Sequence, residues 1–337
     1  MIKKLHAVGL VFIVYVSVYA TTFVLYESSL IVNHEKEYPQ KRHQTTHQTP
    51  VTYTYTPFPI TAVILSHKRP TSLLRENVFP SLISHPSITA VVVGYSDEAK
   101  WIEMQEGWPI ESIQQNDFGG TDLDSGLISF EVALPGTTIH NVNAAELNLK
   151  LGLSLRYFLG SLANTDYLLT IDDDMIVTTE SIDSLLGEYA KNPQRIVGNY
   201  GRTLNWFGLY STQNRYGNVP VVLTKFCIFP RSLCGLFFER QKVIFELLDN
   251  KSHGFFVDGR WLNGEDIFAS LIANEVFGTP EMPAVNFAVE IKLGETYLAG
   301  DEYEPISGGG NPWKMWTHKW DRGRIWQTLE SIMKIND

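Results

Sequence analysis

The segment from Tyr167 to Val177 (YLLTIDDDMIV) restricts the fold more than any other part of the chain. Its apolar start is typical of a strand in a parallel sheet that is covered on both faces. Three adjacent ionised carboxylates, Asp172, Asp173 and Asp174, are costly to bury unless they are paired or bound to a metal. We therefore expect the acids to emerge at the carboxyl edge of the strand, where open α/β sheets bind their ligands.

Grouped carboxylate oxygens at such an edge suit a hard divalent cation, Mn²⁺ or Mg²⁺, with phosphates of a substrate completing its shell. A solvated acidic turn is the alternative interpretation of three consecutive aspartates. The apolar strand in front of Asp172 favours the metal and phosphate site, because a strand end in an open α/β sheet is a ligand-binding position.

Composition and charge narrow the class of protein further. The chain has 337 residues, 44% of them hydrophobic, so it can bury a sizeable core in one large or two fused domains. Its formal net charge of −10 argues against nucleic acid as a partner and against long polyanions held on a broad basic surface. The two cysteines, Cys227 and Cys234, exclude a disulfide scaffold and leave open whether they pair or stay buried thiols.

The amino-terminal residues predict a membrane anchor. Leu5 to Tyr26 contains no Asp, Glu, Lys or Arg and, as a helix, is long enough for a hydrocarbon core of about 30 Å. A cleaved signal peptide is the alternative, but no small-x-small cleavage site follows. Lys3 and Lys4 predict that the short segment before this helix lies in the cytosol. The predicted organisation is a cytosolic tail (1–4), a single-pass type II signal anchor (5–26), a polar stem (27–57) and a lumenal domain (58–337).

Beyond the stem, strands and helices alternate, which predicts a parallel sheet with right-handed crossovers. We expect strands near 60–65, 89–94, 137–141, 167–171, 196–198 and 219–228. We expect helices near 73–83, 144–159, 179–191, 241–248 and 265–275. Residues 95–135 are mixed in pattern and predict a loop-rich insertion.

Two further motifs bear on function. Asn250-Lys251-Ser252 is an N-glycosylation sequon, usable only if this part of the chain is lumenal. Glu265 and Asp266 open a helix after Asn263-Gly264, and acids in a first helical turn are ordinarily capping residues.

The acidic strand, the Glu-Asp helix start and the anchor together resemble the exostosin-like glycosyltransferases of family 64, which have a GT-A fold. The resemblance extends over most of residues 58 to 330. The segments that carry it are Leu153-Ser154 with Arg156-Tyr157, Ile171 to Ile176, Arg195 to Gly198, Gly201-Arg202 followed by Trp206, Val222 to Thr224, Glu265 to Ile267, and His318 with Asp321-Arg322.

The chain departs from this family at three positions. Gly264 and Ile325 stand where the family has two cysteines, so both ends of one disulfide expected from the resemblance are missing together. Lys225 stands where the family has glycine, and a bulky cation there could alter the donor or acceptor pocket.

The resemblance implies a retaining transferase with a GT-A α/β fold, a mixed central sheet flanked by helices, in the Golgi or endoplasmic reticulum membrane. It implies a UDP-sugar donor, N-acetylglucosamine or a related hexosamine as the sugar, and a glycan or glycoprotein acceptor. Homo- and hetero-oligomers both stay open. The alternatives are a transferase for another UDP- or GDP-sugar, and a non-catalytic Golgi module that only binds.

The resemblance also implies roles for individual residues. Asp174, helped by Asp172, is the expected ligand of Mn²⁺ or Mg²⁺, and Asp172 and Asp173 are expected to contact the ribose or to orient the waters of the metal. Asp266, with Glu265, is expected to lie under the reacting sugar. Arg322 is expected to grip the diphosphate or to offset charge in the transition state. The remaining expected substrate contacts are Arg69, Arg156, Arg202 and His318.

Overall fold

The structure, a computed structural model, describes only part of the chain. The described residues are 58–67, 69–109, 112–118, 127–191, 193–205, 209–211, 215, 217–247, 256–257, 260–261, 263–277, 282–284 and 312–335. The expected anchor, the stem and the sequon at 250–252 lie outside them. Among the described residues, no helix combines the length and the apolar composition that a membrane crossing requires.

The described residues form a mixed sheet of ten strands in the order β3-β4-β5-β2-β1-β6-β11-β7-β14-β9. Strands β5, β2, β1 and β6 run parallel to one another, and antiparallel strands flank them on both sides. The strands of this sheet are β1 (Ile60–Ser66), β2 (Ile88–Tyr95), β3 (Ile113–Phe118), β4 (Leu127–Leu134), β5 (Thr137–Asn143), β6 (Tyr167–Asp172), β7 (Val197–Gly198), β9 (Gly217–Val219), β11 (Phe226–Pro230) and β14 (Met282–Ala284). The expected α/β fold with a mixed central sheet is confirmed.

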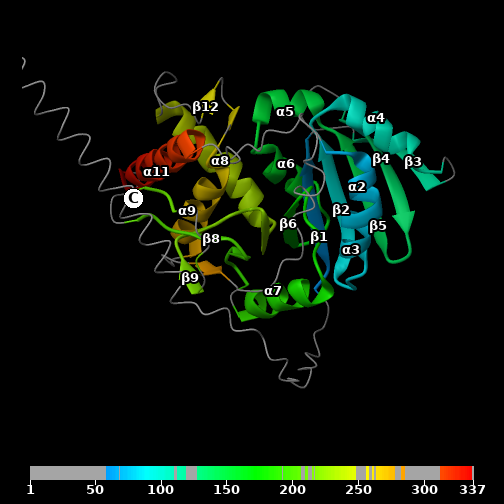
Figure 1. Cartoon of the computed structure of the whole chain (residues 1–337), viewed down its shortest axis with the longest axis horizontal. Coiled ribbons are helices and arrows are strands. Elements are labelled where there is room, and N and C mark those ends of the chain that lie inside the picture. Colours follow the sequence, from blue (N-terminus) through cyan, green and yellow to red (C-terminus); the bar gives the residue numbers. More distant parts are fainter. Residues whose placement is uncertain are drawn as a thin grey trace, which may run out of the picture. The chain divides into compact units, whose positions relative to one another are not determined.

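Short strand pairs and helices surround this sheet. The pairs are β8 (Gly201–Arg202) with β10 (Val221–Val222), and β12 (Phe256–Val257) with β13 (Arg260–Trp261). The helices are α2 (Thr71–Leu73), η1 (Leu74–Val78), α3 (Phe79–Ile83), α4 (Glu98–Glu106), α5 (Ala145–Leu151), α6 (Leu155–Ser161), α7 (Thr179–Lys191), α8 (Ser232–Leu247), α9 (Glu265–Phe277) and α11 (Pro312–Ile335). Figure 1 shows α8, α9 and α11 gathered together, away from the helices α2 to α4 of the amino-terminal part.

The parallel strands are buried on both faces, as the apolar run before the acids predicts. Leu168 of β6 joins the core cluster that contains residues of α5, α6, α8, α9 and α11. Its neighbour Leu169 joins the second cluster, built with residues of η1, α3, α4 and α7. Successive side chains of a strand point to opposite faces, so helices cover the sheet on both sides.

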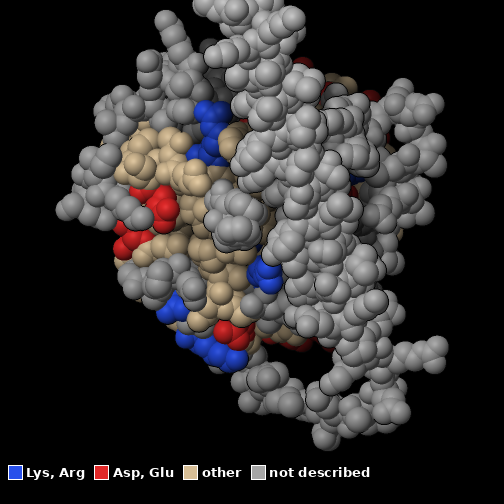
Figure 2. All heavy atoms as spheres, turned by 60° about the vertical axis from the view of Figure 1, so that its left-hand side comes forward, with Lys and Arg blue, Asp and Glu red and all other residues tan. Residues whose placement is uncertain are grey.

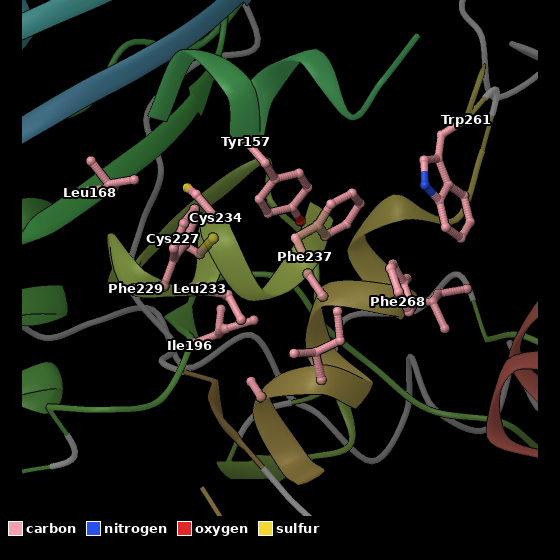
Figure 3. Close-up of a cluster of buried hydrophobic side chains, with 14 of the residues drawn as sticks. Tyr157, Leu168, Ile196, Cys227, Phe229, Leu233, Cys234, Phe237, Trp261 and Phe268 are labelled. Carbon is pink, nitrogen blue, oxygen red and sulfur yellow. The ribbon is translucent and has the colours of Figure 1, made fainter. Parts of the chain in front are cut away.

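Aromatic side chains fill the first cluster (Figure 3). The rings of Tyr157 and Phe237 stack with centroids 4.0 Å apart, and Trp261 stacks on Phe268 with centroids 5.2 Å apart. Cys227 and Cys234 both lie in this cluster as free, buried thiols. The question left open by the sequence is therefore answered in favour of two buried thiols.

Two sequence predictions are wrong in detail because tertiary contacts override the local pattern. The single helix expected at 144–159 is split into α5 and α6 at Gly152, which has φ +57°. An added Cβ there would lie 2.1 Å from the carbonyl oxygen of Trp261, so close backbone packing requires glycine. The loop-rich insertion expected at 95–135 contains α4, β3 and β4, and β4 is held by antiparallel pairing with β5.

Element boundaries also differ after the acidic strand. The strand expected over 219–228 is three pieces, β9, β10 and β11, and a turn at Thr224-Lys225 separates the last two. Helix α8 begins at Ser232 instead of 241, and its first turns pack Leu233, Cys234 and Phe237 into the aromatic cluster.

Candidate active site

The three aspartates leave the sheet where β6 ends. Asp172 is the last residue of β6, and its N–H donates at 3.0 Å to the carbonyl oxygen of Lys225, which directly precedes the neighbouring strand β11. The N–H of Met175 donates to the carbonyl oxygen of Asp172 at 3.2 Å, which closes a turn around the acids. Met175 is buried again, so the carboxylates are confined to one short turn at the carboxyl edge of the sheet.

Arg69, from the segment after β1, holds two of these acids. Its Nη2 lies 2.6 Å from Asp174 Oδ2, and its Nε lies 3.6 Å from Asp173 Oδ1. Asp173 also accepts the N–H of His67 at 3.2 Å. Burial raises the pKa of Asp173 to about 6, against the lowering effect of the His67 N–H and of Arg69. The other oxygen of Asp174, Oδ1, is buried and has no hydrogen-bond partner.

Asp172 faces two different cations. Arg156 Nη2 lies 2.9 Å from Asp172 Oδ1, while its Nη1 donates to the carbonyl and the hydroxyl of Thr224 at 2.5 and 2.7 Å. Lys225 Nζ lies 3.7 Å from Asp172 Oδ2. Burial by itself would lower the pKa of Lys225, but the charges of Asp172 and Asp174 raise it. The ammonium group is therefore charged at neutral pH.

A second acidic centre lies at the start of α9. Asp266 is 4% exposed, and its Oδ1 accepts a short hydrogen bond from Arg322 and another from the N–H of Ile267 at 2.8 Å. Arg322, on α11, also donates from Nη1 to Asn263 Oδ1 at 2.7 Å. A buried carboxylate paired with a buried guanidinium is strongly fixed in place, because either charge alone would be costly to bury. Asp266 is thus held as an oriented carboxylate.

Glu265 lies beside Asp266 and differs from it. Its Oε2 is buried without a hydrogen-bond partner. Burial, followed by the negative charge of Asp266, raises the pKa of Glu265 to about 7, against the lowering effect of Arg322 and Arg156. Glu265 is therefore a carboxyl that gains or loses a proton near neutral pH.

Aromatic and basic side chains complete this centre. The guanidinium of Arg322 lies over the ring of Tyr210, 4.5 Å from its centroid. Burial raises the pKa of Tyr210 to about 12, against the lowering effect of Arg322 and Arg202. Arg202 is itself buried, which lowers its pKa. Tyr210 therefore carries a neutral phenol between two arginines.

Arg156 connects the two acidic centres. Burial would lower its pKa, but the charges of Asp172, at the end of β6, and of Glu265, at the start of α9, raise it. Its neighbour Tyr157 is close enough to α9 for its hydroxyl to reach the carbonyl oxygen of Glu265 at 3.4 Å. The structure thus brings together two groups of acids that are far apart in the sequence.

The acidic turn fits a divalent cation only if a substrate supplies part of the coordination shell. Among the described residues, no three His, Cys, Asp or Glu side chains gather as a potential metal-binding group. The chain does offer the unpartnered buried oxygen of Asp174, in the same turn as Asp172 and Asp173. Hard oxygen ligands of this kind suit Mn²⁺ or Mg²⁺ when phosphate oxygens occupy the remaining positions.

The structure brings most of the residues expected in the site into two clusters. Asp172, Asp173 and Asp174 lie with Arg69 and Arg156, and Glu265 and Asp266 lie with Arg322 and near Arg202. The side chain of His318 lies outside the described residues. Sequence reasoning missed Tyr210, and it also missed Tyr200, whose ring centroid lies 5.7 Å from Lys225 Nζ. Isolated tyrosines carry no pattern that separates a site residue from a core residue.

Figure 2 shows how the charged side chains are distributed over one face of the molecule. Basic and acidic atoms form small separate groups there, surrounded by uncharged residues. On the described part of this face, no continuous basic surface is visible.

A mixed α/β sheet that presents grouped carboxylates at the end of a buried strand, beside a second buried acid, is consistent with the GT-A class of sugar-transferring enzymes. Residues 131–334 match the glycosyl transferase family 64 domain. This is more than half of the chain, so the protein belongs to glycosyl transferase family 64 and is a glycosyltransferase, with a sugar donor and an acceptor. A search of curated proteins found no match.

Proposed function

We propose that this protein is a metal-dependent, retaining glycosyltransferase that moves N-acetylglucosamine, or a related hexosamine, from a UDP donor to a glycan or glycoprotein. The family assignment supports sugar transfer. The observation that carries the proposal is the buried, unpartnered oxygen of Asp174 at the carboxyl edge of the sheet. An acceptor atom left without a donor in a closed site is costly, which favours a bound cation in the working enzyme.

Asp174 and Asp172 are the residues proposed to hold Mn²⁺ or Mg²⁺. When bound, the cation stabilises the charge of the leaving diphosphate as the bond to the sugar breaks. Arg69 is already within hydrogen-bond distance of Asp174, so its guanidinium lies where a diphosphate would meet the acidic turn. Arginine suits this position because its planar group binds phosphate oxygens in pairs.

Asp266 is proposed to orient the reacting sugar or to stabilise positive charge that develops on it. The carboxylate is fixed by Arg322 and by the N–H of Ile267, so it does not have to reorganise during the reaction. In this arrangement Arg322 acts on the reaction through the position of Asp266. Glu265, with its unpartnered oxygen, is proposed to accept a hydrogen bond from a sugar hydroxyl.

We also propose a location in the Golgi or endoplasmic reticulum membrane, with residues 5–26 as the type II anchor and the catalytic domain in the lumen. The uncharged amino-terminal segment behind Lys3 and Lys4 supports this location.

A screen of nucleotide sugars with the purified full-length chain tests the function. We expect hydrolysis or transfer of a UDP-hexosamine with Mn²⁺, and its loss with a chelator. Turnover of UDP-galactose, UDP-glucose or a GDP-sugar instead would keep the reaction and change the donor. The absence of turnover with every sugar, together with the absence of UDP binding, would contradict an enzymatic role.

A non-catalytic binding module is the second candidate. The observation in its favour is that Arg69, Arg156 and Lys225 already pair with the acids of the turn, which reduces their attraction for a cation. The same screen separates the two candidates, because a module of this kind would show no turnover.

A further inference from the structure

Lys225 is placed in the site by the backbone. Its carbonyl oxygen accepts the N–H of Asp172 at 3.0 Å, and β11, which starts at the next residue, pairs antiparallel with β6. The position of Lys225 beside the acidic turn is therefore set by the register of the sheet. A substitution of its side chain should leave this hydrogen bond intact.

The ammonium group of Lys225 is only loosely engaged. Its distance of 3.7 Å from Asp172 Oδ2 exceeds the length of a hydrogen bond, and the side chain is 23% exposed. Arg156, the other partner of Asp172, is 9% exposed and uses both terminal nitrogens in hydrogen bonds of 2.5 to 2.9 Å. Of these two cations, Lys225 is the one with donors to offer to a ligand.

We propose that Lys225 is a phosphate-binding residue, and that it makes the affinity of this site for a diphosphate less dependent on a divalent cation. The inference rests on the proposed function, in which the diphosphate belongs to a nucleotide sugar. Lysine is a compact point charge with three donors, which suits an anion whose oxygens approach from solvent.

The charges around the acidic turn support this role. Three carboxylates, Asp172, Asp173 and Asp174, face the cations Arg69, Arg156 and Lys225. The ion pairs of the turn are therefore close to electrical neutrality. Without Lys225 the turn would carry an excess negative charge, which would repel a diphosphate unless a metal were present.

Calorimetric titration of the purified full-length chain tests the proposal, with UDP and inorganic pyrophosphate as ligands, in EDTA and then in Mn²⁺. In EDTA, Lys225→Met should weaken the binding of both ligands by about 10- to 100-fold, the effect of losing one hydrogen bond to a charged group. In Mn²⁺ the loss should be smaller, because the cation replaces part of the missing charge. Lys225→Arg should keep most of the affinity.

Lys191→Met is the matched control. This lysine lies at the end of α7, is 70% exposed and pairs with Glu188, so the same change of charge should leave both affinities within about twofold. Thermal unfolding of each variant verifies its fold. If Lys225→Met does not fold, Lys225→Gln carries the same comparison.

Three results would overturn the inference while leaving the proposed function in place. The first two are an affinity of Lys225→Met in EDTA that equals or exceeds that of the unmodified chain. The third is binding by the unmodified chain in Mn²⁺ but not in EDTA. If the unmodified chain binds neither UDP nor pyrophosphate under either condition, the proposed function fails and this inference with it.

Discussion

Gly264 and Ile325 are packed so closely that a Cβ added to Gly264 would lie 2.7 Å from Cγ2 of Ile325. Gly264 precedes α9 and has φ +85°, and Ile325 is a buried residue of α11. These are the two positions at which the resemblance to the family implies a pair of cysteines. In this chain an apolar contact joins the two segments that carry Asp266 and Arg322, the buried ion pair of the site.

This contact predicts coupled effects on stability. Gly264→Ala should cost about 1 to 3 kcal/mol, from the positive φ and the clash with Ile325. Ile325→Ala should cost about 2 to 4 kcal/mol through the cavity it leaves. The double variant should cost less than the sum, because the new methyl group of residue 264 enters space vacated by Ile325. Urea unfolding measures all three, and strict additivity would contradict the contact.

Because Cys227 and Cys234 form no disulfide, we expect a reductant to leave the stability of the protein unchanged. Both are free and buried, and burial raises the pKa of each to about 12, so neither is an effective thiolate at neutral pH. Adding dithiothreitol should therefore leave the melting temperature unchanged. A fall of several degrees would mean that a disulfide stabilises the chain, since such a bond contributes about 2 to 4 kcal/mol.

Removal of Asp174, whose Oδ1 has no hydrogen-bond partner, should abolish metal-dependent nucleotide binding. Asp174→Ala deletes the oxygen proposed to hold the cation and leaves Arg69 without its closest carboxylate. Calorimetry should show UDP binding that no longer responds to Mn²⁺. Asp166→Ala is the control, because Asp166 is 86% exposed and its pair with Arg231 is 4.0 Å long. An unchanged response to Mn²⁺ in Asp174→Ala would exclude Asp174 as a ligand.

Asp266→Asn should separate binding from transfer. The acidic turn at the end of β6 is untouched, so UDP should bind normally, while turnover should collapse because the fixed negative charge is lost. The variant should also lose about 3 kcal/mol of stability, since Arg322 is left buried without its counter-charge. Turnover and urea unfolding are measured on the same samples, with Asp166→Asn beside them. Near-normal turnover would remove Asp266 from the catalytic residues.

Because burial raises the pKa of Glu265, we expect the stability of the folded protein to fall as pH rises. Its pKa is raised to about 7, so between about pH 4.5 and 7 the folded state binds more protons than the unfolded state, which favours unfolding with increasing pH. Glu265→Gln removes this term and should make the protein more stable at pH 8, by about 3 kcal/mol at most. Urea unfolding at several pH values measures the difference. Equal pH profiles of the two proteins would contradict a raised pKa.

The same substitution should lower activity. Glu265 holds a buried oxygen without a partner, which is a stability cost that a sugar hydroxyl would offset in the complex. A variant that is more stable at pH 8 and transfers sugar more slowly is therefore expected. Higher stability with unchanged turnover would assign Glu265 no part in substrate binding.

How far the sequence predicted the fold depended on how local the responsible interactions are. The strand expected at 167–171 is β6, because five apolar or β-branched residues between polar ones need little else to define a buried strand. The elements α4, β3 and β4 were not predicted. Strand β3 (IQQNDF) is mostly polar, and antiparallel pairing of β3 with β4 and of β4 with β5 defines these strands, not an apolar run. Gly152 ended a predicted helix for a reason invisible locally, its contact with Trp261.

For the site, the sequence predicted the acids and several of their cations but not the pairs that they form. By itself it determined that Asp172, Asp173 and Asp174 stand at the end of a buried strand, because ionised groups cannot continue into an apolar core. Only the tertiary structure decided that Arg322 of α11 fixes Asp266, that Arg156 lies between the two acidic centres, and that Lys225 faces Asp172. These partners depend on how helices from distant parts of the chain pack against the sheet and, for Lys225, on the pairing of β11 with β6. Charge interactions act only over short distances in space.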